Sequence, residues 1–132
     1  MRYLASLLML QQTPAAMPAK PDPQRVEKEL AADADVLRSL RDNGDVPGIS
    51  RPVDVRFIGA AASIAALENR IGSLGWRVVQ RVPTGDDSEA LDVQRDQTTE
   101  PAEIRRLTEA ALAIESRYGV RYDGWGTVAT KR

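Results

Sequence analysis

The side chains that could transfer protons in this chain are mainly carboxylates, because the sequence contains no histidine and no cysteine. Histidine is the usual general base near neutral pH, and both residue types are common metal ligands. Their absence excludes Ser-His and Cys-His catalysis, thiolate zinc sites and disulfides. The aspartates that could serve instead are scattered along the chain: Asp33, Asp35, Asp54, Asp92 and Asp123. We therefore predict a protein that is not an enzyme and that holds no metal or cofactor.

Two of these aspartates, Asp54 and Asp92, lie at matching places in two segments that alternate apolar and polar residues. If the segments are neighbouring strands, two like charges come together, which would perturb the pKa of both groups. The simpler interpretation is that both carboxylates face solvent or pair with Arg56 or Arg95, and we favour it.

Direct binding of nucleic acid is not indicated. The formal net charge of the 132-residue chain is -1, so there is no basic excess to contact phosphates. RNA recognition by stacking would place aromatic residues on the central strands, but residues 90–97 contain none. No glycine-rich loop of the phosphate-binding type follows a strand. The run Asp42-Asn43-Gly44-Asp45 does not match a calcium-binding loop and is typical of a helix end followed by a turn.

The most distinctive stretch is residues 118–128, which hold two of the three tyrosines, one of the two tryptophans and three of the nine glycines. Glycines beside large aromatic residues indicate unusual backbone conformations, or a ring lying over bare backbone. Trp125 could anchor an interface or could be a core ring with its N–H satisfied. The candidate protein-binding residues are Tyr122, Asp123, Gly124, Trp125 and Gly126.

The periodicity of apolar residues predicts the elements that position this stretch. A first helix begins at Pro23, with Asp22 as its cap and Asp33 among the polar residues of other faces, and ends at Asn43-Gly44. A second helix, entered through residues 59–63, ends at Gly75. A third begins at Pro101, with a threonine hydroxyl as its cap, and ends at Gly119. Strands are expected at 52–58, 76–82, 89–97 and 120–129, with a turn cluster at 83–88.

The first 22 residues are expected to precede the domain, which then spans 23–129 and is followed by a tail at 130–132. The apolar run from Leu4 to Leu10 is too short to span a bilayer. It resembles a weak signal peptide, or it is a disordered leader. If that leader comes from a start codon assigned too early, Met17 is the true first residue of the protein. We favour the leader and a cytoplasmic protein; a signal peptide in the first 19 residues would make the protein exported.

The chain repeats one pattern twice: strand, apolar-striped helix, glycine, strand. Two such βαβ units in tandem predict an α+β, ferredoxin-like βαββαβ sandwich, in which two helices cover one face of a four-stranded antiparallel sheet. The first helix is additional. Its apolar stripe predicts that it covers a sheet edge or part of the open sheet face.

The run Tyr122-Asp123-Gly124-Trp125-Gly126-Thr127, directly after the helix end Tyr118-Gly119, resembles the signature of the RraB family, the protein regulators of ribonuclease E activity. The resemblance extends roughly from Val26 to Val128. It also includes Asn43-Gly44-Asp45, Arg51-Pro52-Val53 and Leu74-Gly75-Trp76. It implies a bacterial, non-enzymatic protein with this fold that binds ribonuclease E, or another degradosome protein, and reduces or redirects RNA cleavage.

Two functions of different classes are therefore open. The first is this regulator of an RNA-degrading enzyme. The second is a generic module that binds a protein or a small ligand on its open sheet face and has no role in RNA decay. An exposed apolar patch on that face, away from the Trp125 strand, would favour the second.

Overall fold

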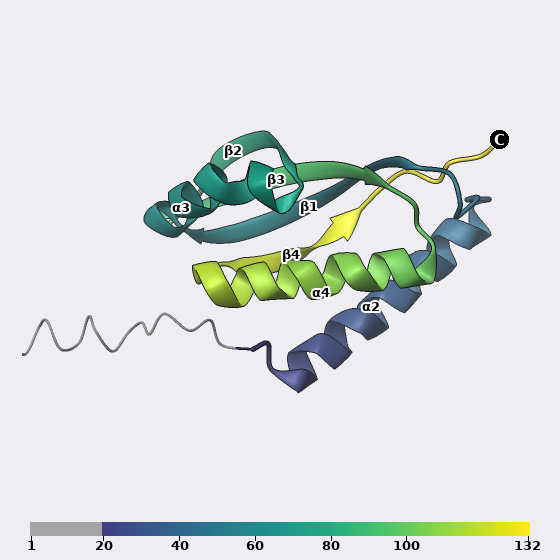
Figure 1. Ribbon diagram of the computed structural model, residues 1–132, viewed down its shortest axis with the longest axis horizontal. Coiled ribbons are helices and arrows are strands. Elements are labelled where there is room, and N and C mark those ends of the chain that lie inside the picture. Colours follow the sequence, from purple (N-terminus) through teal and green to yellow (C-terminus); the bar gives the residue numbers. More distant parts are fainter. Residues whose placement is uncertain (1–19) are drawn as a thin grey trace, which may run out of the picture.

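The computed structural model describes residues 20–132, which form three α-helices and one four-stranded sheet (Figure 1). In chain order the elements are α2 (Pro23–Asp42), β1 (Arg51–Ala60), α3 (Ala61–Ile71) with the 3-10 turn η2 (Gly72–Leu74), β2 (Arg77–Gly85), β3 (Ser88–Gln97), α4 (Pro101–Tyr118) and β4 (Arg121–Gly126). The predicted α+β class, with this number of helices and strands, is confirmed. The predictions about a leader or signal peptide fall on residues 1–19 and lie outside the described part.

The sheet is antiparallel throughout, with the strand order β2-β3-β1-β4. The central strands β1 and β3 pair over their whole lengths, from Arg51 opposite Gln97 to Ala60 opposite Ser88. β4 is therefore one edge of the sheet and β2 the other. This position of β4 matters for the candidate site, because one side of an edge strand has no neighbouring strand.

The core lies between one face of the sheet and the helices α3 and α4. Alternate residues of β1 point into it, and Val53 and Phe57 have no exposed surface. The helices contribute residues at helical spacing, among them Ile64 and Leu67 of α3 and Leu107 of α4. Full burial of each such side chain stabilises the fold by roughly 1.5–3 kcal/mol.

Helix α2 begins and ends as predicted. The side chain of Asp22 accepts a hydrogen bond from the backbone N–H of Gln24 (3.0 Å), and Asn43 is the C-cap residue. The helix packs against α4 (Figure 1), so it does not cover the open sheet face. Among its apolar residues only Leu40 is buried. Polar contacts must therefore contribute to holding α2 in place.

Three boundary predictions were wrong. The cluster 83–88 is not one loop: β2 continues to Gly85, and the turn consists of Asp86 and Asp87, both with positive φ (50° and 64°). β4 ends at Gly126 instead of residue 129. The N-cap of α4 is Glu100 without a side-chain capping bond. The hydroxyl of Thr99, which was expected near this cap, instead donates a hydrogen bond to a carboxylate in another loop.

Candidate protein-binding site

A β-bulge shapes the aromatic and glycine-rich segment. Val55 of β1 lies opposite Trp125, and Phe57 lies opposite Tyr122, so two steps along β1 correspond to three along β4. The extra residue disrupts the alternation of faces, and Gly124 provides the positive φ (91°) that the bend uses. Tyr122 and Trp125 therefore both contact the core, although their odd spacing in an ideal strand would place them on opposite faces.

The Trp125 ring lies on the helix side of the sheet, where a carboxylate of α2 holds it. The indole N–H donates to Asp33 Oδ1 (2.8 Å), and the hydroxyl of Thr108 in α4 donates to Oδ2 of the same carboxylate (2.6 Å). Asp33 is only 5% exposed, and burial raises its pKa, although the two hydrogen bonds act in the opposite direction. The expectation that Asp33 lies on another face of α2 was wrong. Its position three residues after Leu30 and four before Leu37 was the signal in the sequence.

Tyr122 is buried, so its side chain is part of the core. It is 2% exposed and its ring lies 6.1 Å from that of Phe57. Its hydroxyl has no hydrogen-bond partner among residues 20–132. Of the five candidate residues, the side chain of Tyr122 is thus the one that a partner cannot reach on the folded surface.

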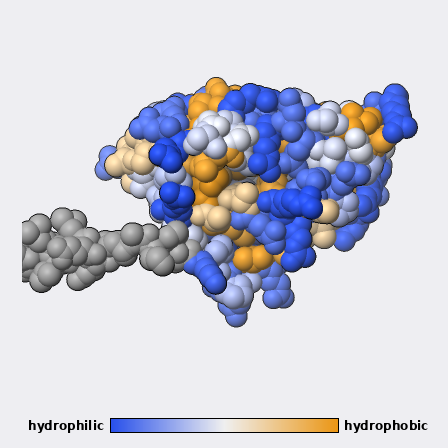
Figure 2. Space-filling model, in the orientation of Figure 1, coloured by the Kyte–Doolittle hydropathy of each residue, from blue (hydrophilic) through white to orange (hydrophobic). Residues whose placement is uncertain are grey.

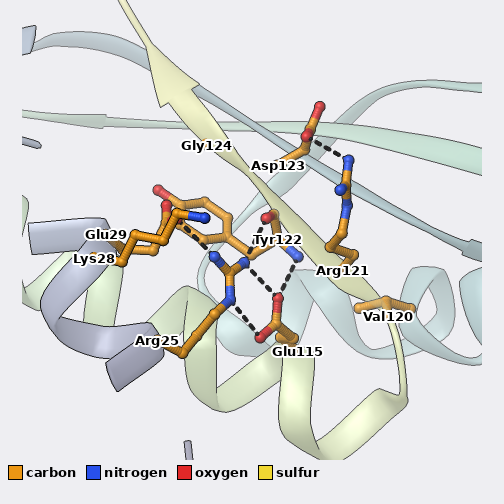
Figure 3. A pocket seen from close by; sticks show the side chains of 9 residues that line it. All are labelled: Arg25, Lys28, Glu29, Glu115, Val120, Arg121, Tyr122, Asp123 and Gly124. Carbon is orange, nitrogen blue, oxygen red and sulfur yellow. Dashed lines mark hydrogen bonds and ion pairs between the residues drawn. The ribbon is translucent and has the colours of Figure 1, made fainter. Parts of the chain in front are cut away.

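The backbone of Tyr122 is bound by two side chains from different helices (Figure 3). Its N–H donates to Glu115 Oε1 of α4 (2.8 Å), and its C=O accepts from Arg25 Nη2 of α2 (3.0 Å). Arg25 also forms two hydrogen bonds with Glu115, at 2.8 and 3.1 Å, and one with Glu29 at 2.6 Å. Burial raises the pKa of Glu115, but the bonds from Arg25 and Tyr122 outweigh it, so the pKa lies below its usual range. We call Arg25 and Glu115 the edge clamp.

Asp123 is the exposed member of the candidate segment. Its carboxylate accepts a hydrogen bond from Arg121 (3.0 Å) on the side of β4 away from the clamp (Figure 3). Asp123 and Gly124 separate two shallow hollows of about 470 and 560 Å³. The first is lined by the edge clamp and the second by the open face of the sheet. A Cβ added to Gly124 or Gly126 would meet no other atom within 4 Å. The bulge is therefore a ridge of accessible backbone.

The open sheet face carries paired polar groups. Arg56 forms a bidentate ion pair with Asp92 (2.7 and 3.0 Å), and this pair lowers the pKa of Asp92. Asp54 accepts from Gln94 Nε2 (2.8 Å). The structure thus bears out the predicted pairing of Asp92 with Arg56, while Asp54 takes an amide partner instead of an arginine.

Apolar residues are sparse on this face. The exposed large hydrophobic residues among positions 20–132 are Val78, Val79 and Val128. A small apolar spot is formed where Ala90 lies opposite Ile58 and Val82, but Ala90 is buried and the other two are half-buried. In the view of Figure 2, apolar side chains instead reach the surface over α2 and α4, bordered by polar ones. A shallow groove there is lined by Leu30, Leu37 and Ile104.

The sequence did not reveal a second polar cluster. This cluster links the loop after α2 to the loop between β3 and α4 and to the segment after β4. Asp45 accepts hydrogen bonds from Arg51 (2.7 Å), Thr99 (2.7 Å) and the N–H of Thr130 (2.8 Å). The side chains of Asp45 and Arg51 are 1% and 4% exposed. Burial alone would raise the pKa of Asp45, but its donors outweigh this and lower it.

These features define a class of protein before any comparison. Some ion pairs of residues 20–132 link different elements, such as Arg56 with Asp92, and others lie within one helix, such as Arg105 with Glu109. No group of three or more potential metal ligands occurs in this range. No helix in that range has the length and apolarity needed to cross a bilayer. Residues 20–132 thus form a small α+β domain whose edge strand β4 carries a ridge of accessible backbone.

The family follows from the sequence comparison. The profile of the family described as regulator of ribonuclease activity B, RraB, matches residues 30–127, which extend from within α2 to just beyond β4. This is well over half of the chain, and the chain belongs to the RraB family. A comparison with curated individual proteins gave no match.

Proposed function

We propose that this chain is a non-enzymatic regulator that binds ribonuclease E, or another protein of the RNA degradosome, and reduces or redirects RNA cleavage. The observation that carries the proposal is the RraB match across the sheet and all three helices, since the family is described as a regulator of ribonuclease activity. On this proposal the protein works in the bacterial cytoplasm and acts on the enzyme without binding RNA itself. The net charge of -1 supports the last point.

We also assign the fold as ferredoxin-like with one added helix. The element order after α2 is βαββαβ, and the strand order β2-β3-β1-β4 places the first and third strands at the centre. Both observations support the assignment. The fold alone does not indicate a function, because many unrelated functions share it.

The contact surface that we propose is the ridge at Asp123 to Gly126. The rings of Tyr122 and Trp125 support this ridge from the core side. Tyr122 belongs to the core, and Trp125 packs against it and donates a hydrogen bond to Asp33. Its outer side offers the Asp123 carboxylate and two glycines whose missing side chains leave open space. A partner can therefore approach the backbone closely, and an added methyl group should obstruct it.

The generic module is the weaker alternative. Its distinguishing feature would be an exposed apolar patch on the open sheet face. That face instead carries the ion pair Arg56–Asp92 and the amide bond between Gln94 and Asp54. Such self-paired polar groups offer little apolar area to a ligand.

The proposal can be tested with purified full-length chain and full-length ribonuclease E from the same bacterium. Binding is measured by an immobilised-partner assay, and cleavage is followed with a fluorescent single-stranded RNA. We expect binding and a lower or redirected cleavage rate. We expect Gly126→Ala to weaken binding about tenfold, which corresponds to roughly 1.4 kcal/mol. The matched control is Gly48→Ala, since a Cβ at Gly48, in the loop before β1, also meets no atom within 4 Å.

The outcomes separate the partner from the surface. If the unchanged chain neither binds ribonuclease E nor alters cleavage, and no degradosome protein is recovered with it from the native host, the regulator proposal is wrong. If it binds and both glycine variants bind equally well, the ridge is not the contact. A shift of the RNA by the chain alone in an electrophoretic assay would contradict the absence of direct RNA binding.

A further inference from the structure

The edge of β4 is closed by side chains in place of a strand. Tyr122 presents its backbone N–H and C=O outward, away from β1, since both groups bond to side chains of α4 and α2. A neighbouring antiparallel strand would provide the same two partners, one acceptor and one donor. The edge clamp of Arg25 and Glu115 thus imitates one step of a fifth strand.

The other edge of the sheet is protected differently. β2 contains Pro83, which has no N–H to offer, and its pairing with β3 is interrupted between Val78 and Gln80. Prolines and bulges on edge strands are common obstacles to pairing with another chain. β4 contains no proline, and its bulge lies at Asp123 and Gly124, beyond Tyr122. The clamp therefore protects the regular part of this edge at Tyr122.

The β4 sequence is complementary to itself once the clamp is removed. In an antiparallel pair of two β4 strands centred on Tyr122, the two Tyr122 residues would exchange both backbone hydrogen bonds. The same register places Arg121 of each copy opposite Asp123 of the other, so two ion pairs form by symmetry. Within one chain these two side chains already form an exposed ion pair on one side of β4.

We propose that the edge clamp keeps the β4 edge closed, and that its release opens a surface for a second copy of this chain through symmetric β4–β4 pairing. The clamp joins α2 to α4, so displacement of the start of α2 would release it. This inference does not depend on binding to ribonuclease E. It concerns the outer backbone of β4, on the side that Figure 3 shows occupied by Arg25 and Glu115.

The first test removes the clamp and measures self-association. The double variant Arg25→Ala with Glu115→Ala should show concentration-dependent dimerisation in sedimentation equilibrium, beyond any association of the unchanged chain. The matched control is Arg105→Ala with Glu109→Ala, an exposed Arg–Glu pair within α4. Equal association of both double variants, or no gain over the unchanged chain while circular dichroism shows an intact fold, would overturn the proposal.

The second test examines the register. In the clamp-free background, Asp123→Arg places like charges opposite one another and should weaken dimerisation about tenfold or more. Adding Arg121→Asp restores the opposite charges and should recover dimerisation. If the first change leaves the dimer unaffected, the pairing does not use this register, and the proposal fails.

A milder variant tests the same contact even if the double alanine variant fails to fold. Glu115→Gln keeps an acceptor for the Tyr122 N–H but removes the charge that faces Arg25. Hydrogen exchange of the Tyr122 amide should then be faster than in the unchanged chain and slower than in monomeric Glu115→Ala at low concentration. The same exchange rate in all three chains would show that Glu115 does not close the edge.

Discussion

Gly124 adopts a φ of 91°, and this one residue determines where its aromatic neighbours point. Left-handed backbone costs an L-amino acid with a side chain roughly 1–2 kcal/mol. An added Cβ would meet no other atom within 4 Å, so conformational strain is the only expected penalty. We predict that Gly124→Ala lowers the free energy of unfolding by about 1–2 kcal/mol, measured by urea denaturation.

Gly126→Ala is the control for this change, because its φ lies outside the left-handed region and its Cβ also has open space. It should leave stability within about 0.5 kcal/mol of the unchanged chain. Equal stabilities of the two variants would mean that the bulge relaxes without cost. The ridge would then not depend on glycine at position 124.

The carboxylate of Asp33 is buried and joined to two hydrogen-bond donors, Trp125 and Thr108. Asp33→Ala leaves the indole N–H without its acceptor and should cost about 1–3 kcal/mol. Asp33→Asn can retain both contacts, since its Oδ1 can accept from the indole while its amide donates to the hydroxyl oxygen. It also avoids a buried charge. We therefore expect the Asn variant to be at least as stable as the unchanged chain near neutral pH.

Urea denaturation monitored by tryptophan fluorescence checks this order of stabilities. Asp35→Asn is a suitable control, because Asp35 is exposed on the same helix. A loss in Asp33→Asn as large as in Asp33→Ala would show that the negative charge itself holds α2, contrary to the expectation from burial.

At the scale of elements, the loop after α2 is fastened by the buried pair of Asp45 and Arg51. Removing one partner of a buried ion pair is costly, because the other charge remains in a poorly solvated place. We predict that Asp45→Asn destabilises the protein by about 3–5 kcal/mol in chemical denaturation. Asp35→Asn, which breaks an exposed pair with Arg38, should cost at most about 0.5 kcal/mol.

A stability loss below about 1 kcal/mol in Asp45→Asn would contradict this assignment. It would indicate that the remaining donors find other acceptors. The N–H of Thr130 reports the difference locally, because its hydrogen bond to Asp45 ties the segment after β4 to this loop. Its amide should lose protection from hydrogen exchange in the variant.

The helices were predictable because their signals are local. Asp22 and Pro23 mark the start of α2, and Gly119 marks the end of α4. Each signal lies within one turn of the helix end that it sets. The alternation of apolar and polar residues likewise indicated β1 and β3. The extension of β2 past Pro83 was missed because proline usually ends a strand, whereas on an edge strand its missing N–H leaves a neighbour's bonds intact.

The aromatic and glycine-rich segment was evident in the sequence, but its geometry was not. Tyr122 and Trp125 stand three residues apart, which a regular strand would place on opposite faces, and only the bulge at Gly124 reconciles them. The partners Arg25 and Asp33 lie more than 90 positions earlier in the chain. No periodic pattern within one segment can show such contacts.

At the scale of the whole molecule, α2 buries little of its apolar surface fully and is also held by polar contacts to β4. Leu40 is its only buried apolar residue, while Arg25 and Asp33 bond to β4. Helices held in this way open at a lower free energy than the core. The structure therefore couples α2 to the features on which the two proposals depend. Asp33 in the middle of the helix contacts Trp125 of the ridge, and Arg25 near its start contacts the edge of β4.

The pH dependence of folding follows from the same carboxylates. Asp45, Asp92 and Glu115 have lowered pKa values in the folded state, so the stability they contribute is present above their unfolded pKa and is lost as pH falls. Asp33 has a raised pKa, so its contribution has the opposite sign: it is present at low pH and is lost as pH rises through the folded value. Three groups with lowered pKa values therefore act against one with a raised pKa. Ordinary carboxyl pKa values lie near 4. We therefore expect the midpoint of urea denaturation to fall steadily as the pH is lowered from about 6 to 3.

The variant Asp33→Asn isolates the opposing contribution. It removes a group that favours folding at low pH, so its advantage over the unchanged chain near pH 7 should shrink as the pH is lowered through the folded pKa of Asp33. The measurement is the difference in unfolding free energy between the two chains at each pH. A difference that stays constant across this range would mean that Asp33 titrates alike in the folded and unfolded states. The carboxylate that holds Trp125 would then not be an unfavourably buried charge.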